Sequence, residues 1–286
     1  MSPLAHLSVT TPGAAPAAVT EDAALEARLD PARLPRHLAI IMDGSGRWAA
    51  RHHRPRVSGH LAGMRAVREV VETCTRLKIP ALTLYAFSAE NWRRPMAEVN
   101  FLMRLLRRYL RSEVAELSRN NVRLEAIGRL HELPAVVRQD LEHTRALTAA
   151  NTGMVLTLAL NYSARHELAD ACQALIEQAR REGRLDSLRV EEKDLAAHLS
   201  TAHLPELDLL IRTSGELRIS NFLLWQLAYA ELWTTSVLWP DFCSTDLLQA
   251  LVDFQGRERR FGGLSAQEAE RHRLKQPRSE RQSRRP

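Results

Sequence analysis

Short apolar segments alternate with helical patterns along most of the 286 residues. We expect strands at residues 37–42, 81–87, 122–127, 154–160, 207–212 and 234–238. Helical patterns lie at about 59–77, 95–120, 133–149, 164–182, 191–200 and 221–230, and a last one follows at 244–259. This alternation predicts an α/β fold in a single domain, with a central, mostly parallel six-stranded sheet flanked by helices. Ligands of such sheets bind beyond the carboxyl ends of the strands, so the residues that follow each strand carry the functional argument.

The first predicted strand ends in a compact group of acidic, small and basic residues. Asp43 is followed by Gly44, Ser45, Gly46 and Arg47. The glycines let the chain turn sharply and bring backbone N–H groups close to a ligand, and a helix that begins after them adds its positive N-terminal end. A carboxylate beside an anion site suits Mg²⁺ bridging to phosphate oxygens, and Arg47 can neutralise a phosphate. The stretch therefore indicates a diphosphate–magnesium site.

Two other interpretations fit the same stretch. Gly44, Gly46 and Ala49 match the loose dinucleotide-binding fingerprint. That fingerprint also requires an acid at the end of the second strand to hold the ribose, and residues 85–88 contain none. The stretch also matches an ordinary strand–turn–helix corner in which Asp43 caps the helix. On its own, it leaves the ligand site and the corner open.

Polar residues also follow the second, fourth and fifth predicted strands, at 87–94, 161–165 and 212–220. Five arginines lie at strand ends or in the loops after them, namely Arg47, Arg56, Arg94, Arg212 and Arg218. This is more positive charge than one phosphate needs, and it suits two diphosphates, with Asp43 and Glu231 as candidate metal ligands. A diphosphate-binding cleft is therefore favoured over a corner.

The two ends of the chain differ in composition from its centre. Residues 1–33 begin with a stretch rich in Ala, Pro, Thr and Ser, and we expect a disordered extension with a short helix at about 21–29. Residues 264–286 carry seven Lys/Arg and three Asp/Glu, which is +4 of the formal net charge of +6, and we expect a disordered basic tail. The domain between them is predicted to span 34–263.

Three widely spaced cysteines without a CxxC pair argue against a disulfide framework or a zinc site and favour a reducing compartment. The sequence has no apolar run of spanning length and no signal-peptide pattern at its start. We therefore expect a cytoplasmic protein.

Four long blocks of sequence, in order, resemble the cis-prenyltransferases, the family that includes the undecaprenyl diphosphate synthases. They are residues 41–49 with Gly59 and His60, then 85–95, then 212–226 with 229–232 and 238–242, and finally 257–263. The resemblance extends from Leu34 to Gly263. Trans-prenyltransferases hold their metals with a DDxxD pair, and this chain contains no Asp-Asp.

The resemblance implies condensation of isopentenyl diphosphate onto an allylic diphosphate of the geranyl or farnesyl type, with a new cis double bond and an undecaprenyl-like product. It also implies Mg²⁺, a homodimer, an apolar product tunnel and peripheral association with a membrane. Asp43 and Asn91 would be catalytic, the latter near the step of proton removal, and Asp43 and Glu231 would bind the metal. The substrate-binding positions implied are Gly44, Ser45, Gly46, Arg47, Trp48, Arg56, His60, Ser88, Ala89, Glu90, Trp92, Arg94, Arg212, Arg218, Ile219 and Ser220.

The chain departs from the family pattern at Ser45, where the family has Asn, at Ser163 and Ala164, where it has two glycines, and at Arg129, where it has Asp. Ser45 lies in the implied active site and is expected to affect rate or substrate choice. Met103, Leu105 and Leu106 are interpreted as core residues of a helix, and Met154 is expected near the tunnel floor.

Three alternatives to a long-chain synthase differ in what they predict. A non-catalytic partner subunit would have lost the first-strand acid and the arginines of the third block, which are retained here. A short-chain synthase of specialised terpenoids would stop after one or two additions. Nucleic-acid binding through the basic tail would disappear when residues 264–286 are deleted, and it is the less favoured interpretation because such tails are usually disordered or rest on anionic lipid.

Overall fold

A computed structural model of the chain describes residues 20–257. Six strands form one sheet: β1 (His37–Ile41), β2 (Ala81–Ser88), β3 (Arg123–Ile127), β4 (Val155–Tyr162), β5 (Leu209–Arg212) and β6 (Glu231–Thr234). Their order is β3-β4-β2-β1-β5-β6, and every neighbouring pair is parallel. The predicted α/β class with a single six-stranded sheet is confirmed, and the sheet is parallel throughout.

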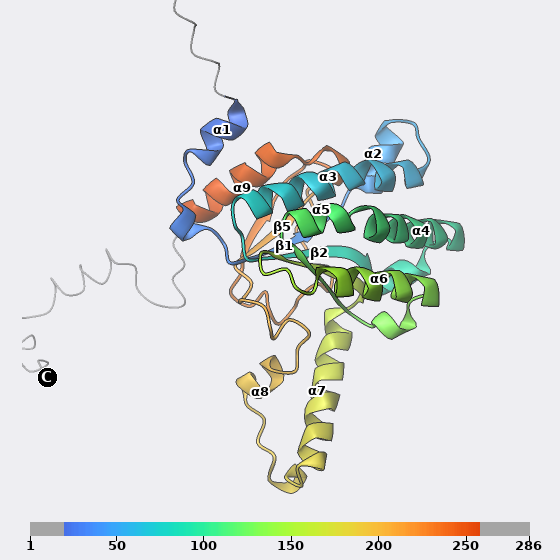
Figure 1. The fold of residues 1–286 in the computed structure, drawn as a ribbon, viewed down its shortest axis with the longest axis vertical. Helices are drawn as coiled ribbons and strands as arrows, with labels where there is room; N and C mark the ends of the chain where they lie inside the picture. Colours follow the sequence, from blue (N-terminus) through green and yellow to red (C-terminus); the bar gives the residue numbers. More distant parts are fainter. Residues whose placement is uncertain (1–19, 258–286) are drawn as a thin grey trace, which may run out of the picture.

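One face of the sheet is covered by α3 (Arg56–Arg76), α4 (Met96–Ser112), α6 (Ala135–Thr148) and α9 (Ser244–Gly256) (Figure 1). Side chains alternate along β1, so Leu38 and Ile40 point into this core while Ala39 and Ile41 point to the other face. All five residues of β1 are buried because both faces are covered. The larger core cluster therefore lies between β1, β2, β4 and the α3–α4 side.

The opposite face packs against the segment that contains Phe222 and Leu223 and against Ala164, the first residue of α7 (Ala164–Arg181), which then extends away from the sheet (Figure 1). The prediction of a helix at 221–230 is wrong, because the chain forms consecutive turns there. Ser220, Asn221 and Leu223 have positive φ values of 49°, 60° and 46°, which an α-helix excludes. The apolar residues of this segment still pack against the sheet. The sequence pattern therefore predicted correctly that the segment is buried, but it predicted the wrong secondary structure.

The remaining elements are α1 (Glu21–Glu26), α2 (Ser45–Arg51), α5 (Val114–Arg119), α8 (Glu192–Ala196) and five short 3₁₀ helices, at Pro31–Arg33, Ala89–Arg93, Leu130–Glu132, Leu185–Ser187 and Trp239–Asp241. The single helix expected at 95–120 is divided between α4 and α5 at Glu113, whose carboxylate accepts hydrogen bonds from Arg68 of α3. The last strand, expected at 234–238, begins earlier, at Glu231.

The short helix expected at about 21–29 is confirmed as α1, but residues 20–33 pack on the domain and do not form the disordered extension that was expected. In this segment α1 packs on α9, with Leu25 buried and Asp22 accepting hydrogen bonds from Ser244 and Thr245 at the start of α9. Gln255 near the end of α9 also exchanges hydrogen bonds with the backbone of Asp30. Residues 1–19 and 258–286, which include the basic tail and the end of the predicted domain, lie outside the described residues.

The sheet order determines where a ligand site forms. β1 lies between β2 and β5, and the chain builds outward from β1 in both directions, so the direction of winding changes between β1 and β5. A crevice at the carboxyl ends of the strands is expected at such a point. Within residues 20–257, no helix is long and apolar enough to cross a membrane.

Candidate active site

The register of β1 and β5 places the residues after them side by side. Ile41 pairs with Arg212, so Asp43 lies next to the Arg212 side chain. Arg212 Nη2 donates to Asp43 Oδ2 at 2.9 Å, and Nη1 donates to Ser220 Oγ at 2.8 Å and to the carbonyl of Arg218. The Arg212 side chain is only 5% exposed, whereas that of Asp43 is 32% exposed. Arg212 is therefore buried and held in place by Asp43, Ser220 and the Arg218 carbonyl, whereas the Asp43 carboxylate is partly exposed to solvent.

Asp43 is stabilised in its charged form by several donors. The Gly44 N–H donates to Asp43 Oδ1 at 2.7 Å, and Arg47 Nη2 lies 3.4 Å from Oδ2. Burial alone would raise the pKa of Asp43, but the hydrogen bond and charge of Arg212, the Gly44 amide and Arg47 outweigh it and lower that pKa. Thr213 Oγ1 exchanges hydrogen bonds with the Asp43 backbone and fixes the strand end. The carboxylate is therefore ionised and oriented at neutral pH.

The turn after Asp43 and its contact with α3 depend on glycines, because a side chain at these positions would be strained or would clash. Gly44 has φ +107°, and a Cβ there would lie 2.9 Å from Leu238 Cδ2. Gly44 caps α2, which begins at Ser45. A Cβ at Gly59 of α3 would lie 1.9 Å from the Ser45 carbonyl oxygen, so α2 and α3 touch backbone to backbone. This close contact positions the turn over the crevice.

A single buried carboxylate, Glu98 of α4, contacts three of the predicted site residues, two arginines and a histidine. Its Oε1 lies 3.1 Å from Arg56 Nε, 3.0 Å from Arg94 Nη1 and 3.4 Å from His60 Nε2. The Glu98 side chain is 9% exposed. Burial and the Arg94 charge lower the pKa of His60, and Glu98 acts in the opposite direction. Residues of two helices are thus joined into one cationic group.

The end of β2 contributes a third set of side chains. Asn91 Oδ1 accepts a hydrogen bond from the Ser88 N–H at 3.1 Å, which closes the 3₁₀ turn. Glu90 Oε1 accepts from Asn221 Nδ2 at 2.8 Å, and although burial would raise the pKa of Glu90, these hydrogen bonds lower it. Asn91 is therefore held by its carbonyl oxygen.

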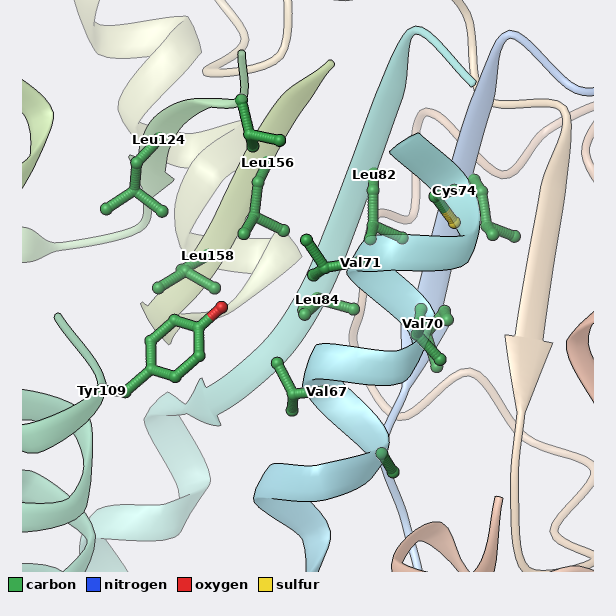
Figure 2. Close-up of a cluster of buried hydrophobic side chains, with 14 of the residues drawn as sticks. Val67, Val70, Val71, Cys74, Leu82, Leu84, Tyr109, Leu124, Leu156 and Leu158 are labelled. Carbon is green, nitrogen blue, oxygen red and sulfur yellow. The ribbon is translucent and has the colours of Figure 1, made fainter. Parts of the chain in front are cut away.

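These groups surround the mouth of a cavity of about 600 Å³. Its interior is apolar, and Val67 of α3, Leu84 of β2, Tyr109 of α4 and Leu158 of β4 converge on the same space (Figure 2). The predicted site residues that line it are Asp43, Ser45, His60, Ser88, Glu90, Asn91, Arg94, Arg212 and Ser220.

Four residues of the sequence analysis were assigned to the core or to the tunnel floor. Met103, Leu105 and Leu106 were interpreted as core; Met103 lies in the core cluster and Leu106 packs against it, and all three also line the cavity. Met154, expected near its floor, is buried in the core cluster and is not among the lining residues. It lies just before β4, at the end of the sheet away from the cavity mouth.

Several predicted positions do not reach the cavity. Trp48 Nε1 donates to Asp241 Oδ1 at 2.6 Å, and its ring stacks on His52 outside the cavity. Trp92 Nε1 donates to Asn161 Oδ1 at 2.8 Å. The other positions that are not lining residues are Gly44, Gly46, Arg47, Arg56, Ala89, Arg218 and Ile219; of these, Arg47 and Arg56 contact lining residues or their partners, and Ile219 packs in the second core.

The predicted metal pair, Asp43 and Glu231, stays a prediction, although the strand register separates the two residues within the chain. Glu231 pairs with Leu209 at the start of β5, three residues before Arg212, so it lies roughly 10 Å along the strands from the Asp43 end. Its Oε2 accepts a hydrogen bond from Arg257 Nη1 at 2.8 Å. Across residues 20–257, no group of three or more His, Cys, Asp or Glu is arranged to hold a metal ion.

The sequence analysis missed two acids of this site. Glu98 is the acid on an otherwise basic α4 and follows Arg94 by four residues, the spacing of a helical ion pair. Glu216 lies 3.3 Å from Arg47 and also pairs with Arg218. Taken together, the cations, one open carboxylate and an apolar interior suit an amphiphile with an anionic head group.

Comparison with known proteins gives a consistent result. Residues 41–262 match the undecaprenyl diphosphate synthase family of prenyltransferases. The chain is 52% identical over 239 residues to an isoprenyl transferase of Geobacter sulfurreducens, covering 84% of this chain and 97% of that one. It is 50% identical over 244 residues to an isoprenyl transferase of Heliobacterium mobile, covering 85% and 94%. A crystal structure of lavandulyl diphosphate synthase from Lavandula x intermedia with dimethylallyl diphosphate is 36% identical, with a TM-score of 0.77, covering 81% of this chain and 99% of that one.

Proposed function

Because the chain belongs to the undecaprenyl diphosphate synthase family of prenyltransferases, we propose that it is a magnesium-dependent cis-prenyltransferase. It condenses isopentenyl diphosphate onto an allylic diphosphate of the geranyl or farnesyl type and gives a polyprenyl diphosphate of undecaprenyl-like length. The observation that carries this proposal is the position of the Asp43 carboxylate, flanked by Arg47 and Arg212, at the mouth of an apolar cavity of about 600 Å³.

The charges divide into two groups that match two diphosphates. Arg56, His60 and Arg94 gather on Glu98, on the α3–α4 side of Asp43, and suit the allylic diphosphate. Arg212 with Ser220 lies on the β5 side and suits isopentenyl diphosphate. Fixed cations of this kind stabilise the negative charge that develops on a leaving diphosphate.

The donor set around Asp43 fits a magnesium ion shared with substrate. Mg²⁺ prefers oxygen ligands, keeps several waters and is commonly bound by one or two carboxylates together with substrate phosphates. Asp43 offers one partly exposed, ionised carboxylate beside the proposed diphosphate position, and Glu231, the other predicted ligand, lies farther along the strands within the same chain. When bound there, the ion would add positive charge to the diphosphate oxygens.

The chain itself supplies binding, orientation and exclusion of water. Arg47 and Arg212 hold the Asp43 carboxylate, and the apolar walls at Val67, Leu84 and Leu158 keep water from a cationic allylic carbon. Asn91 lines the cavity with its side-chain oxygen engaged by Ser88, which leaves its amide group to orient a substrate near proton removal.

Radiolabelled isopentenyl diphosphate with geranyl or farnesyl diphosphate tests the proposal, with Mg²⁺ or with EDTA and with products separated by length. Metal-dependent long products are expected. A product that stops after one or two additions would identify a short-chain synthase instead. No incorporation by folded protein, alone or with added relatives, would refute the catalytic assignment and favour a partner subunit. A Ser45→Asn variant then shows whether this departure from the family sets rate or primer choice.

Three further properties belong to the same proposal. A homodimer is supported by the exposed apolar residues Leu224 and Leu232 on and before the edge strand β6, and size-exclusion chromatography with light scattering tests it. A cytoplasmic location is supported by the free cysteines Cys74, Cys172 and Cys243. A polyprenyl product implies contact with a membrane surface, and we propose no nucleic-acid partner.

A further inference from the structure

Helices α3 and α4 present a cluster of arginines outside the cavity of the candidate active site. We define the α3–α4 arginine face as Arg65 and Arg68 of α3 together with Arg104, Arg107, Arg108 and Arg111 of α4. On α4 these residues recur at helical spacing, so they share one side of the helix. The two helices lie side by side over the sheet (Figure 1).

This face carries a net positive charge, although the described part of the chain as a whole has almost no net charge. Of the 40 Lys/Arg and 34 Asp/Glu of the chain, 31 and 30 lie in residues 20–257, so the described part is almost neutral. On the face, Glu113 pairs with Arg68, and Asp140 pairs with Arg107 and Arg111. The other three, Arg65, Arg104 and Arg108, are exposed and have no ion-pair partner among residues 20–257.

A second cavity of about 500 Å³ opens on this face beside Arg65, Arg68 and Arg108. It shares the wall residues Met64, Leu105 and Tyr109 with the cavity that contains the candidate active site. The two spaces are therefore separated by flexible apolar side chains between α3 and α4. Leu61, which is 51% exposed, also lines the outer cavity.

The first cavity is too small for a long product. At roughly 30 Å³ for each non-hydrogen atom, about 600 Å³ holds roughly 20 such atoms, or about four isoprene units. An undecaprenyl-like chain outgrows this space while its diphosphate remains at the arginines of the mouth. The growing tail must then leave the protein, and the wall of Met64, Leu105 and Tyr109 that the apolar cavity shares with the outer cavity marks the shortest way out.

We propose that the α3–α4 arginine face docks the protein on an anionic lipid surface, so that the lengthening tail passes between α3 and α4 directly into the lipid. This inference rests on the proposed function. Unpaired guanidinium groups bind anionic head groups electrostatically, and the exposed Leu61 at the opening meets the acyl region. Nucleic acid fits less well, because neither aromatic side chain that lines the outer cavity is free to stack on a base: Tyr109 is buried, and the Trp48 ring already stacks on His52.

The test compares the full chain with two triple variants. The face variant carries Arg65→Gln, Arg104→Gln and Arg108→Gln. The control variant removes the same charge far from the face, at Arg180→Gln, Arg181→Gln and Arg189→Gln, at and beyond the end of α7 (Figure 1). All three proteins keep the basic tail, so binding through the tail is the same in each.

Co-sedimentation is measured with vesicles of phosphatidylglycerol and phosphatidylcholine and with vesicles of phosphatidylcholine alone. An arginine near an anionic surface contributes roughly fivefold, so the face variant should bind the mixed vesicles on the order of a hundredfold more weakly than the wild type. The control variant should bind like the wild type, and all three should bind phosphatidylcholine weakly. In addition, condensation of one isopentenyl unit onto a short allylic diphosphate without vesicles should be equal in all three proteins.

Equal vesicle binding by the face variant and the wild type would overturn the proposal. The proposal would also be overturned if the face variant still bound vesicles but no longer bound a single-stranded RNA that the wild type binds, because that result would identify a nucleic-acid surface. Failure of all three proteins to condense substrate would refute the proposed function, whereas the difference in vesicle binding would still decide whether this face docks on lipid.

Discussion

Glu98 gives the most informative single perturbation of this site. The substitution Glu98→Gln keeps the shape of the side chain and one hydrogen-bond acceptor but removes the negative charge that Arg56, His60 and Arg94 share. Arg56 and Arg94 then repel each other at the position proposed for the allylic diphosphate. We expect a loss of stability, because the ion pairs with Glu98 are removed, and a change in catalysis, because the arginines lose their fixed orientation.

The contact with Arg94 sets the magnitude for stability. At 3.0 Å and an effective dielectric constant near 20, the gross Coulomb attraction is about 5 kcal/mol. Because Arg94 is partly exposed and Arg56 more so, solvent screens most of this, and a net loss of about 2 kcal/mol is expected, typical of one hydrogen bond to a charged group. In a domain of this size, that lowers the unfolding midpoint by roughly 4–8 °C.

Catalysis should change in kcat rather than in substrate affinity. The variant site is more positive, so the KM for the allylic diphosphate should not rise. The arginines lose their fixed orientation, and kcat should fall by roughly tenfold or more. Glu98 also raises the pKa of His60, so that pKa should fall further in the variant.

Thermal unfolding, steady-state kinetics with the allylic diphosphate varied, and NMR titration of His60 measure these three effects. Glu116→Gln is the matched control, because Glu116 pairs with the exposed Arg119 at the surface and its loss should change stability by less than about 0.5 kcal/mol. A Glu98→Gln variant with a raised KM and unchanged kcat would refute the positioning role. An unchanged pKa of His60 would refute the contact itself.

Three further predictions concern the acid, the helix contact and the cavity wall. Asp43→Asn should lower kcat/KM by on the order of a thousandfold in condensation assays. Since the pKa of Asp43 is lowered in the folded state, its contribution to stability is present above the unfolded pKa and is lost as the pH falls through the folded pKa, so urea midpoints of Asp43→Asn should depend less on acid pH than those of the wild type. Gly59→Ala should cost about 1–3 kcal/mol in urea unfolding, because its Cβ meets the backbone of α2 at 1.9 Å, whereas Gly256→Ala, with open space around it, should be nearly neutral; equal midpoints would contradict the close contact. Leu106→Trp, which narrows the cavity, should shorten the product seen on chromatography, and Met154→Leu, outside it, should leave the length unchanged.

The strand ends could be predicted from the sequence because their signals are local. An apolar run followed at once by Asp43, or by Arg212, determines which residues leave the sheet at its carboxyl edge. Parallel pairing of β1 with β5 then brings the two side chains together without further information. The diphosphate-binding cleft was expected for this reason, and its residues are adjacent in the structure.

Other features depend on packing that a pattern does not record. The apolar residues at 222–225 mimic a helix, but positive φ values at Ser220, Asn221 and Leu223 make turns that press Phe222 against Tyr85 and Tyr162. Glu98 looks like an ordinary helix acid until α3 brings Arg56 and His60 to it. Glu231 was assigned to the metal from the family resemblance, and its distance from Asp43 along the strands depends on a register that the sequence does not record.

The Asp43–Arg212 ion pair couples the two proposed substrate positions. Asp43 Oδ2 accepts the hydrogen bond from Arg212 Nη2 and also lies 3.4 Å from Arg47 Nη2. A cation held by the Asp43 carboxylate would weaken its hold on Arg212 and would leave that guanidinium available to a second diphosphate, so each ligand would favour the other. Because such coupling is reciprocal, isopentenyl diphosphate must strengthen metal binding at Asp43 by the same factor by which the metal strengthens binding of isopentenyl diphosphate.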